Sequence, residues 1–115
     1  MTIGEFTAQT GVTESTLRYY EKIGVLPAVP RDNAGNRIYS DEFVENVQLV
    51  QGLKASGMSL SVIREYISLA HQGESAANAR RSILLATRQA VSEKLAVFKN
   101  AISLLDGQLA ACDNN

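Results

Sequence analysis

The stretch TESTLRYYEKIGVLP, which runs from Thr13 to Pro27, predicts a short amphipathic helix with an abrupt end. The hydroxyl of Thr13 is suited to accept a backbone N–H of the first turn. The apolar residues recur three or four positions apart and so share one face of the helix: Leu17, Tyr20 and Ile23. Gly24 is expected to stop the helix, and Pro27 prevents its continuation.

The other faces of this helix carry hydroxyls, an aromatic ring and cations. The residues are Ser15, Thr16, Arg18, Tyr19 and Lys22. Such groups suit contacts with a phosphate backbone and with base edges. A second helix is predicted upstream, at Ile3–Thr10, with a tight connection at Gly11 and Val12. The pair predicts a helix-turn-helix, although an αα-hairpin in any small helical protein has the same pattern.

The segment AVPRDNAGNRIYS follows, from Ala28 to Ser40, and is rich in turn formers. We expect a small two-stranded wing with a tight turn around 33–36. Arg31 and Arg37 would flank that turn, where arginines suit phosphate or minor-groove contacts. The alternative is a solvated loop whose arginines pair with Asp32 or other nearby acidic residues.

Two further helices are predicted after the wing, beginning after the N-cap candidates Ser40 and Ser59. A break around Gly73 follows, and then a long stretch without proline. Apolar residues recur there with alternating steps of four and three, interrupted by Arg88: Leu84, Val91, Leu95, Phe98, Ile102, Leu105 and Leu109. This heptad seam predicts a long helix that dimerises as a coiled coil. An intramolecular helical hairpin is the alternative, which the lack of a strong break disfavours.

Composition excludes several classes of protein. The 115 residues are 45% apolar and hold one cysteine, so no intramolecular disulfide framework is possible. No membrane segment or signal peptide is recognisable, and a cytoplasmic location is expected. The formal net charge of −1 does not by itself indicate nucleic-acid binding. Cations nevertheless outnumber acidic residues between Thr16 and Tyr39, which allows a local basic surface.

Several N-terminal motifs closely resemble the MerR family of bacterial transcription regulators. They are IGEF, TLRYYEKIGVLP, NRIYS and GLKASGMSLSVIREYI, and together they extend from Thr2 to about Ala70. The resemblance implies a winged helix-turn-helix followed by an antiparallel coiled-coil dimerisation helix. It also implies a homodimer that binds a pseudo-palindromic promoter operator and bends and untwists the DNA for RNA polymerase.

Carried over by motif, the resemblance implies eight candidate DNA-binding residues. Four belong to the recognition helix, three to the wing and one to the third helix: Ser15, Thr16, Arg18 and Tyr19; Arg31, Arg37 and Tyr39; and Lys54. Leu17 and Tyr20 are expected in the core instead. The domains expected are a DNA-binding domain at 1–71, a hinge at 72–75, a dimerisation helix at 76–111 and a short tail at 112–115.

The resemblance does not extend to a sensor. Metal sensors of the family use several cysteines, whereas Cys112 stands alone here, so we expect no metal site and no cofactor. Short family members that respond to aldehydes use a cysteine in the DNA-binding half, where this chain has none. A role for Cys112 as a thiol sensor stays open, although the neighbouring Asp113 would disfavour its thiolate.

Two functional hypotheses remain. The first is a homodimeric, DNA-binding transcription regulator. The second is a helical interaction module that pairs through its long helix without reading DNA, a hypothesis favoured only by the slightly acidic balance of the first seventy residues. An enzyme is not expected, because no nucleophile–base pair, phosphate-binding loop or recognisable carboxylate pair is present.

Overall fold

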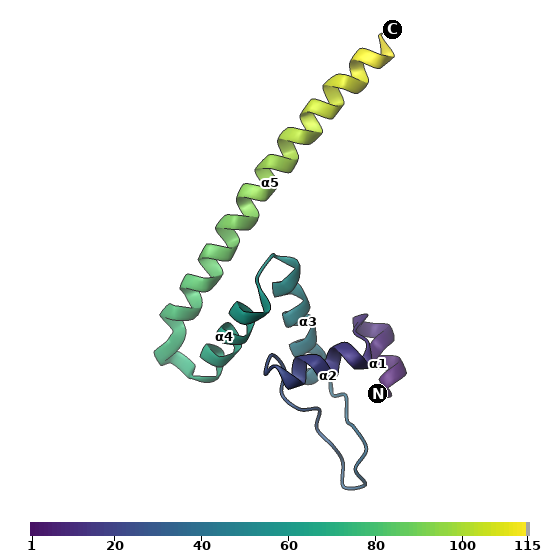
Figure 1. Cartoon of the computed structure of the whole chain (residues 1–115), viewed down its shortest axis with the longest axis vertical. Coiled ribbons are helices and arrows are strands. Elements are labelled where there is room, and N and C mark those ends of the chain that lie inside the picture. The colour runs from purple at the N-terminus through teal and green to yellow at the C-terminus, as the bar shows by residue number, and fades with distance from the viewer. Residues whose placement is uncertain (115) are drawn as a thin grey trace.

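The computed structural model describes residues 1–114 and consists of a helical N-terminal domain and one long helix (Figure 1). The elements in chain order are α1 (Ile3–Thr10), α2 (Glu14–Lys22), α3 (Asp41–Ala55), α4 (Leu60–His71), the 3-10 helix η1 (Gly73–Ala76) and α5 (Ala77–Asp113). The first four α-helices pack together, and α5 extends well beyond them (Figure 1). The molecule is therefore elongated, with principal extents of 71 × 38 × 20 Å.

Side-chain caps define where the helices of the N-terminal domain begin. Thr13 Oγ1 accepts the backbone N–H of Thr16 at the start of α2. Ser40 and Ser59 cap α3 and α4 in the same way. Each cap satisfies a backbone donor that the first helical turn leaves without a partner. The predicted N-caps of these three helices are thus confirmed.

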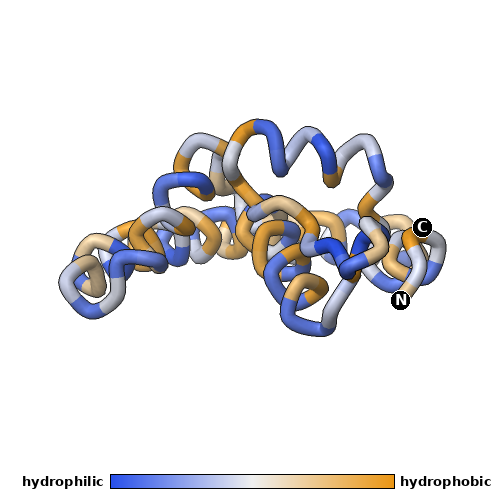
Figure 2. Tube along the Cα trace, turned by 90° about the horizontal axis from the view of Figure 1, so that it is seen from below, coloured by the Kyte–Doolittle hydropathy of each residue, from blue (hydrophilic) through white to orange (hydrophobic). Residues whose placement is uncertain are grey.

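The core lies where α1, α2, α3 and α4 meet. Its completely buried side chains come from all four helices and from the segment after α2: Phe6, Leu17, Val25, Val47, Val50 and Ile63. Along the trace, hydrophobic positions alternate with hydrophilic ones, as amphipathic helices require (Figure 2). Leu17 and Tyr20 are both buried, as expected, so the core fixes the orientation of α2.

The segment between α2 and α3 differs from the predicted two-stranded wing. Within residues 1–114 it forms no strand, only a hairpin closed by one antiparallel bridge between Arg31 and Arg37. Asp32 instead organises the turn, because its Oδ1 accepts the backbone N–H groups of Ala34 and Asn36. The neighbouring Pro30 has no backbone N–H to donate, so the hydrogen-bonded ladder between the two arms of the hairpin cannot extend through it as in a regular sheet. The prediction of strands is therefore not confirmed, although a protruding hairpin is present (Figure 1).

The long helix is continuous from Ala77 to Asp113. It starts one residue later and ends two residues later than the predicted 76–111, so Cys112 lies in the helix and not in a tail. Residue 115 lies outside the described part of the chain. The segment expected as a hinge overlaps η1, and Gly73 there has a φ of +74°, which glycine adopts without strain. The unbroken helix contradicts the alternative of an intramolecular hairpin.

Candidate nucleic-acid interface

Helix α2 presents its predicted recognition residues on the side opposite the core. Ser15, Arg18 and Tyr19 are exposed, while Thr16 is half-buried. The hydroxyls of Ser15 and Thr16 both lie within hydrogen-bond distance of Thr13 Oγ1, at 3.2 and 3.0 Å. Four of the predicted DNA-binding residues are thus brought together on one helix.

Arg18 is held by an ion pair along α2. Its Nη2 lies 2.7 Å from Glu14 Oε1, one helical turn earlier. Both side chains are largely exposed, and such pairs contribute at most about 1 kcal/mol to stability. The guanidinium can therefore exchange Glu14 for a phosphate or a base edge at little cost.

The hairpin brings Arg31 and Arg37 onto adjacent strand-like segments. Arg31 Nη1 donates to the carbonyl of Gly35 at 2.7 Å, which ties this side chain to the turn. The pKa of Arg37 is raised, chiefly by a hydrogen bond with the Tyr39 side chain. Its Nη1 is shielded from solvent and lacks a partner within residues 1–114. Neither arginine forms an ion pair in that part of the chain, in contrast to the alternative of a hairpin neutralised by its own acidic residues.

Tyr39 and Lys54 both have contacts within the protein. Tyr39 is only 4% exposed, so its ring belongs to the core and not to the outer surface of the hairpin. Lys54 Nζ lies 3.5 Å from the hydroxyl of Tyr20 and 5.9 Å from the centre of its ring. Lys54 is exposed, and its contact joins α3 to the buried face of α2.

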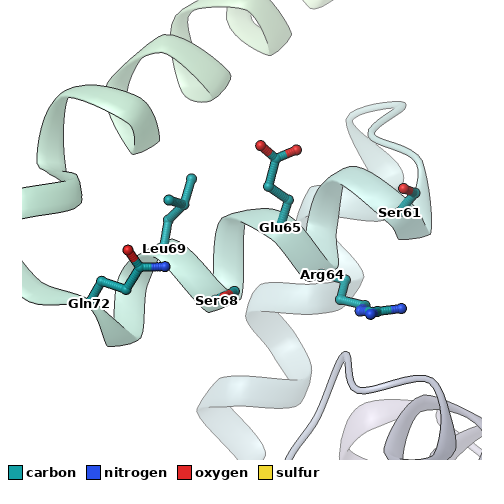
Figure 3. Close-up of a pocket in the computed structure, with 6 residues that line it drawn as sticks. All are labelled: Ser61, Arg64, Glu65, Ser68, Leu69 and Gln72. Carbon is teal, nitrogen blue, oxygen red and sulfur yellow. The ribbon is translucent and has the colours of Figure 1, made fainter.

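Arg64 lies beside the end of α2. The motif GLKASGMSLSVIREYI contains Arg64, but nothing in that pattern marks it as a DNA contact. A Cβ placed on Gly24 would lie 3.8 Å from Arg64 Nε, so the guanidinium passes over the glycine that ends the helix. Arg64 is exposed and points to a different side of α4 from Glu65, which faces the α5 side (Figure 3). Forty residues separate Arg64 from Gly24 in the chain, so only the tertiary structure adds this cation to the surface near α2.

Neither a metal-binding cluster nor a membrane-spanning helix occurs in the described part of the chain. Among residues 1–114, no group of three or more histidine, cysteine or acidic side chains is placed to hold a metal ion. The groove lined by Ser61, Arg64 and Ser68 is shallow and polar and lies along one helix (Figure 3). No helix of the described part of the chain is both long enough and apolar enough to cross a membrane.

Comparison with known proteins agrees with this geometry. The family model of the MerR HTH regulatory proteins matches residues 1–70, and the model described as MerR, DNA binding matches residues 44–108. The chain is 34% identical over 93 residues to the HTH-type transcriptional regulator AdhR of Bacillus subtilis, covering 81% of this chain and 66% of AdhR. It is 33% identical to an HTH-type regulator of Haemophilus influenzae, covering 95% of this chain and 81% of that one.

Two solved structures have the same fold over nearly the whole chain. A MerR family regulator from Listeria monocytogenes has a TM-score of 0.86 at 27% identity, covering 98% of this chain and 86% of that one. HiNmlR, a MerR family regulator lacking the sensor domain and bound to promoter DNA, has a TM-score of 0.81 at 33% identity. The match with HiNmlR covers 95% of this chain and 86% of that one.

These relatives are transcriptional regulators and not enzymes, which supports DNA binding over the alternative of an interaction module. The chain belongs to the MerR family of DNA-binding transcriptional regulators.

Proposed function

We propose that the protein binds a pseudo-palindromic promoter operator as a homodimer and distorts the DNA to control transcription by RNA polymerase. Each subunit places α2 in a major groove and its 30–38 hairpin against the flanking backbone. The DNA-binding unit is residues 1–71, and the dimerisation unit is α5. Because promoter DNA is its ligand, we place the protein in the cytoplasm.

The observation that carries this proposal is that α2 has one buried face and one exposed, polar face. Leu17 and Tyr20 anchor the helix in the core, while Arg18 and Tyr19 project outward beside Ser15. A rigidly held helix with exposed hydrogen-bonding groups has the features of a recognition helix. HiNmlR, whose structure contains promoter DNA, has the same fold at 33% identity.

The hairpin supports contacts outside the major groove. Arg31 and Arg37 in the hairpin, and Arg64 beside Gly24 after the C-terminal end of α2, carry no ion pair within residues 1–114. Arginines of this kind suit phosphate oxygens, which position a protein on the duplex without reading its sequence. We propose that Tyr39 helps to position Arg37, and that Lys54 supports α2 through Tyr20.

A homodimer is supported by the apolar residues of α5. The helix has no buried residue, and its seam side chains from Leu84 to Leu109 are all between 39% and 66% exposed. A contiguous apolar face of this length normally marks an interaction site. A second copy would bury it and would present two α2 helices to one operator, with the deformation energy of the DNA supplied by contacts at both ends.

The proposal is tested by fluorescence anisotropy with DNA from the region upstream of the gene. Wild-type protein should bind this duplex far more tightly than a scrambled one, and Arg18→Ala should weaken specific binding roughly 10- to 100-fold. The matched control is Lys99→Ala, which removes an exposed cation from α5. Equal binding by wild type and Arg18→Ala would contradict the role of α2.

A further inference from the structure

A small pocket lies in the N-terminal domain between α3, α4 and the segment that follows α2. Its volume is about 120 Å³. Val25, Leu26 and Val50 line it and are otherwise buried in the core, and Ile67 of α4 is half-buried beside them. The pocket is thus an apolar recess that the core itself leaves open.

The volume and the lining of this pocket restrict what it can hold. Water is a poor occupant of an apolar recess because it needs several polar partners, whereas an apolar cavity of about 150 Å³ binds a single benzene ring. Pockets for drug-sized molecules start at about 300 Å³. Polar groups are also present in the lining, from Asn46, Tyr66 and His71. The pocket therefore suits one small ring with a single hydrogen-bonding group.

The exposure of Leu49 supports an occupant at this place. Within the described helices α1–α4, Tyr19 and Leu49 are the large apolar or aromatic side chains that remain exposed. Tyr19 belongs to the candidate nucleic-acid interface, but Leu49 lies on α3 and lines the pocket. Its side chain is 47% exposed. A bound molecule would cover apolar surface that the fold leaves in contact with water.

We propose that this pocket binds a small effector, namely a single-ring organic molecule that is largely apolar and carries one hydroxyl or similar group. We further propose that its occupancy changes the affinity of the protein for the operator. This regulatory part rests on the proposed function, whereas the binding site does not.

The connection of the pocket to the recognition helix is direct. Gly24 follows α2, and the backbone N–H groups of Val25 and Leu26 both donate to the carbonyl of Tyr20, at 3.0 and 3.2 Å. The residues that line one side of the pocket are therefore hydrogen-bonded to the last turn of α2. A molecule in the pocket stabilises one arrangement of this turn relative to α3 and α4.

The opposite side of the pocket leads to the long helix. His71 lines the pocket and is the last residue of α4, and η1 and then α5 follow it. One occupant would thus contact the segment that holds α2 and the end of the helix that leads to α5. A ligand that favours the DNA-binding arrangement strengthens operator binding, and the operator strengthens ligand binding by the same factor.

Ligand binding is tested first, without DNA, with phenol as the probe. Phenol is titrated into the full chain and followed by two-dimensional NMR of the methyl and amide groups. We expect saturable shifts centred on Val25, Leu26, Val50 and Ile67. A more hydrophobic two-ring probe, 2-naphthol, should bind more weakly because it exceeds the volume of the pocket. Tighter binding of 2-naphthol, or shifts spread over other surfaces, would overturn the site.

A substitution that fills the pocket provides the matched test. Ala70 is exposed and lines the pocket, so Ala70→Leu should weaken phenol binding at least about tenfold while the domain stays folded. Ala55→Leu adds the same side chain at an exposed position of α3 away from the pocket and should leave binding unchanged. Circular dichroism checks the folding of both variants. Equal phenol binding by wild type and Ala70→Leu would contradict the site.

The regulatory part is tested with the operator. Fluorescence anisotropy at saturating phenol should show the affinity of wild type for the upstream duplex changed by about fivefold or more. The affinity of Ala70→Leu should not respond to phenol, and that of Ala55→Leu should respond as wild type does. An unchanged wild-type affinity, with phenol bound, would overturn the regulatory part.

These outcomes are distinguishable from failure of the proposed function. Absence of specific binding to the upstream duplex, with or without phenol, would contradict the proposed function and the regulatory part together. The NMR titration contains no DNA, so it decides the binding site in either case.

Discussion

The ring of Tyr39 stacks on the ring of Phe6, with centroids 4.8 Å apart and planes inclined by 30°. Phe6 is completely buried in α1, and Tyr39 follows the hairpin that carries Arg31 and Arg37. The stack therefore fixes one end of the hairpin to the core. A third ring, that of Phe43 in α3, has its centroid 5.9 Å from that of Phe6 and extends the cluster.

Tyr39→Ala should destabilise the N-terminal domain by about 3 to 5 kcal/mol, because it removes a buried aromatic ring and leaves a cavity. Tyr39→Phe keeps the ring and should preserve most of the stability. Urea denaturation followed by circular dichroism measures both changes. Similar stabilities for Tyr39→Ala and wild type would contradict the anchoring role of the ring. DNA binding by the folded Tyr39→Phe variant then measures the contribution of the Tyr39 hydroxyl alone.

Glu14→Gln should not weaken operator binding, because it releases Arg18 from an exposed ion pair. We expect equal or several-fold tighter binding at low salt, since a carboxylate facing the DNA is also removed. Anisotropy titrations compare this variant with wild type and with Arg18→Ala. Weaker binding by Glu14→Gln, with stability unchanged, would show that the pair preorganises Arg18 for recognition.

Removing Arg31 or Arg37 should change the salt dependence of binding more than its sequence specificity. The logarithm of the binding constant falls as the logarithm of the salt concentration rises. Removing one phosphate-binding cation from each subunit makes this slope shallower by about two units per dimer. The slope is obtained from titrations between low and moderate salt, on both operator and scrambled duplexes. An unchanged slope for Arg37→Ala would place Arg37 away from the backbone of the DNA.

Leu95→Asp and Phe98→Asp should each abolish the dimer and, with it, operator binding. Both side chains are exposed in the single chain, so the substitutions leave the N-terminal domain folded but introduce charge at the centre of the seam. Sedimentation velocity measures the association state. A stable dimer in both variants would exclude the heptad seam of α5 as the interface. The corresponding control is Ser103→Asp, which places the same charge on α5 outside the seam.

Much of the fold follows from local sequence. Thr13, Ser40 and Ser59 cap the helices that follow them because a short hydroxyl side chain satisfies the nearest free backbone N–H, an interaction confined to a few residues. The periodicity of Leu17 and Tyr20 likewise predicts the buried face of α2. The continuous helix from Ala77 follows from a long run without proline.

Tertiary structure alone decided how distant residues meet. The sequence predicted strands in the hairpin, but Asp32 takes up the turn's N–H groups and leaves one bridge between Arg31 and Arg37. The sequence also does not predict that Arg64 lies over Gly24 or that the ring of Tyr39 stacks on that of Phe6. Capping and periodicity act within a few residues along the chain, whereas these contacts depend on how whole helices pack in three dimensions.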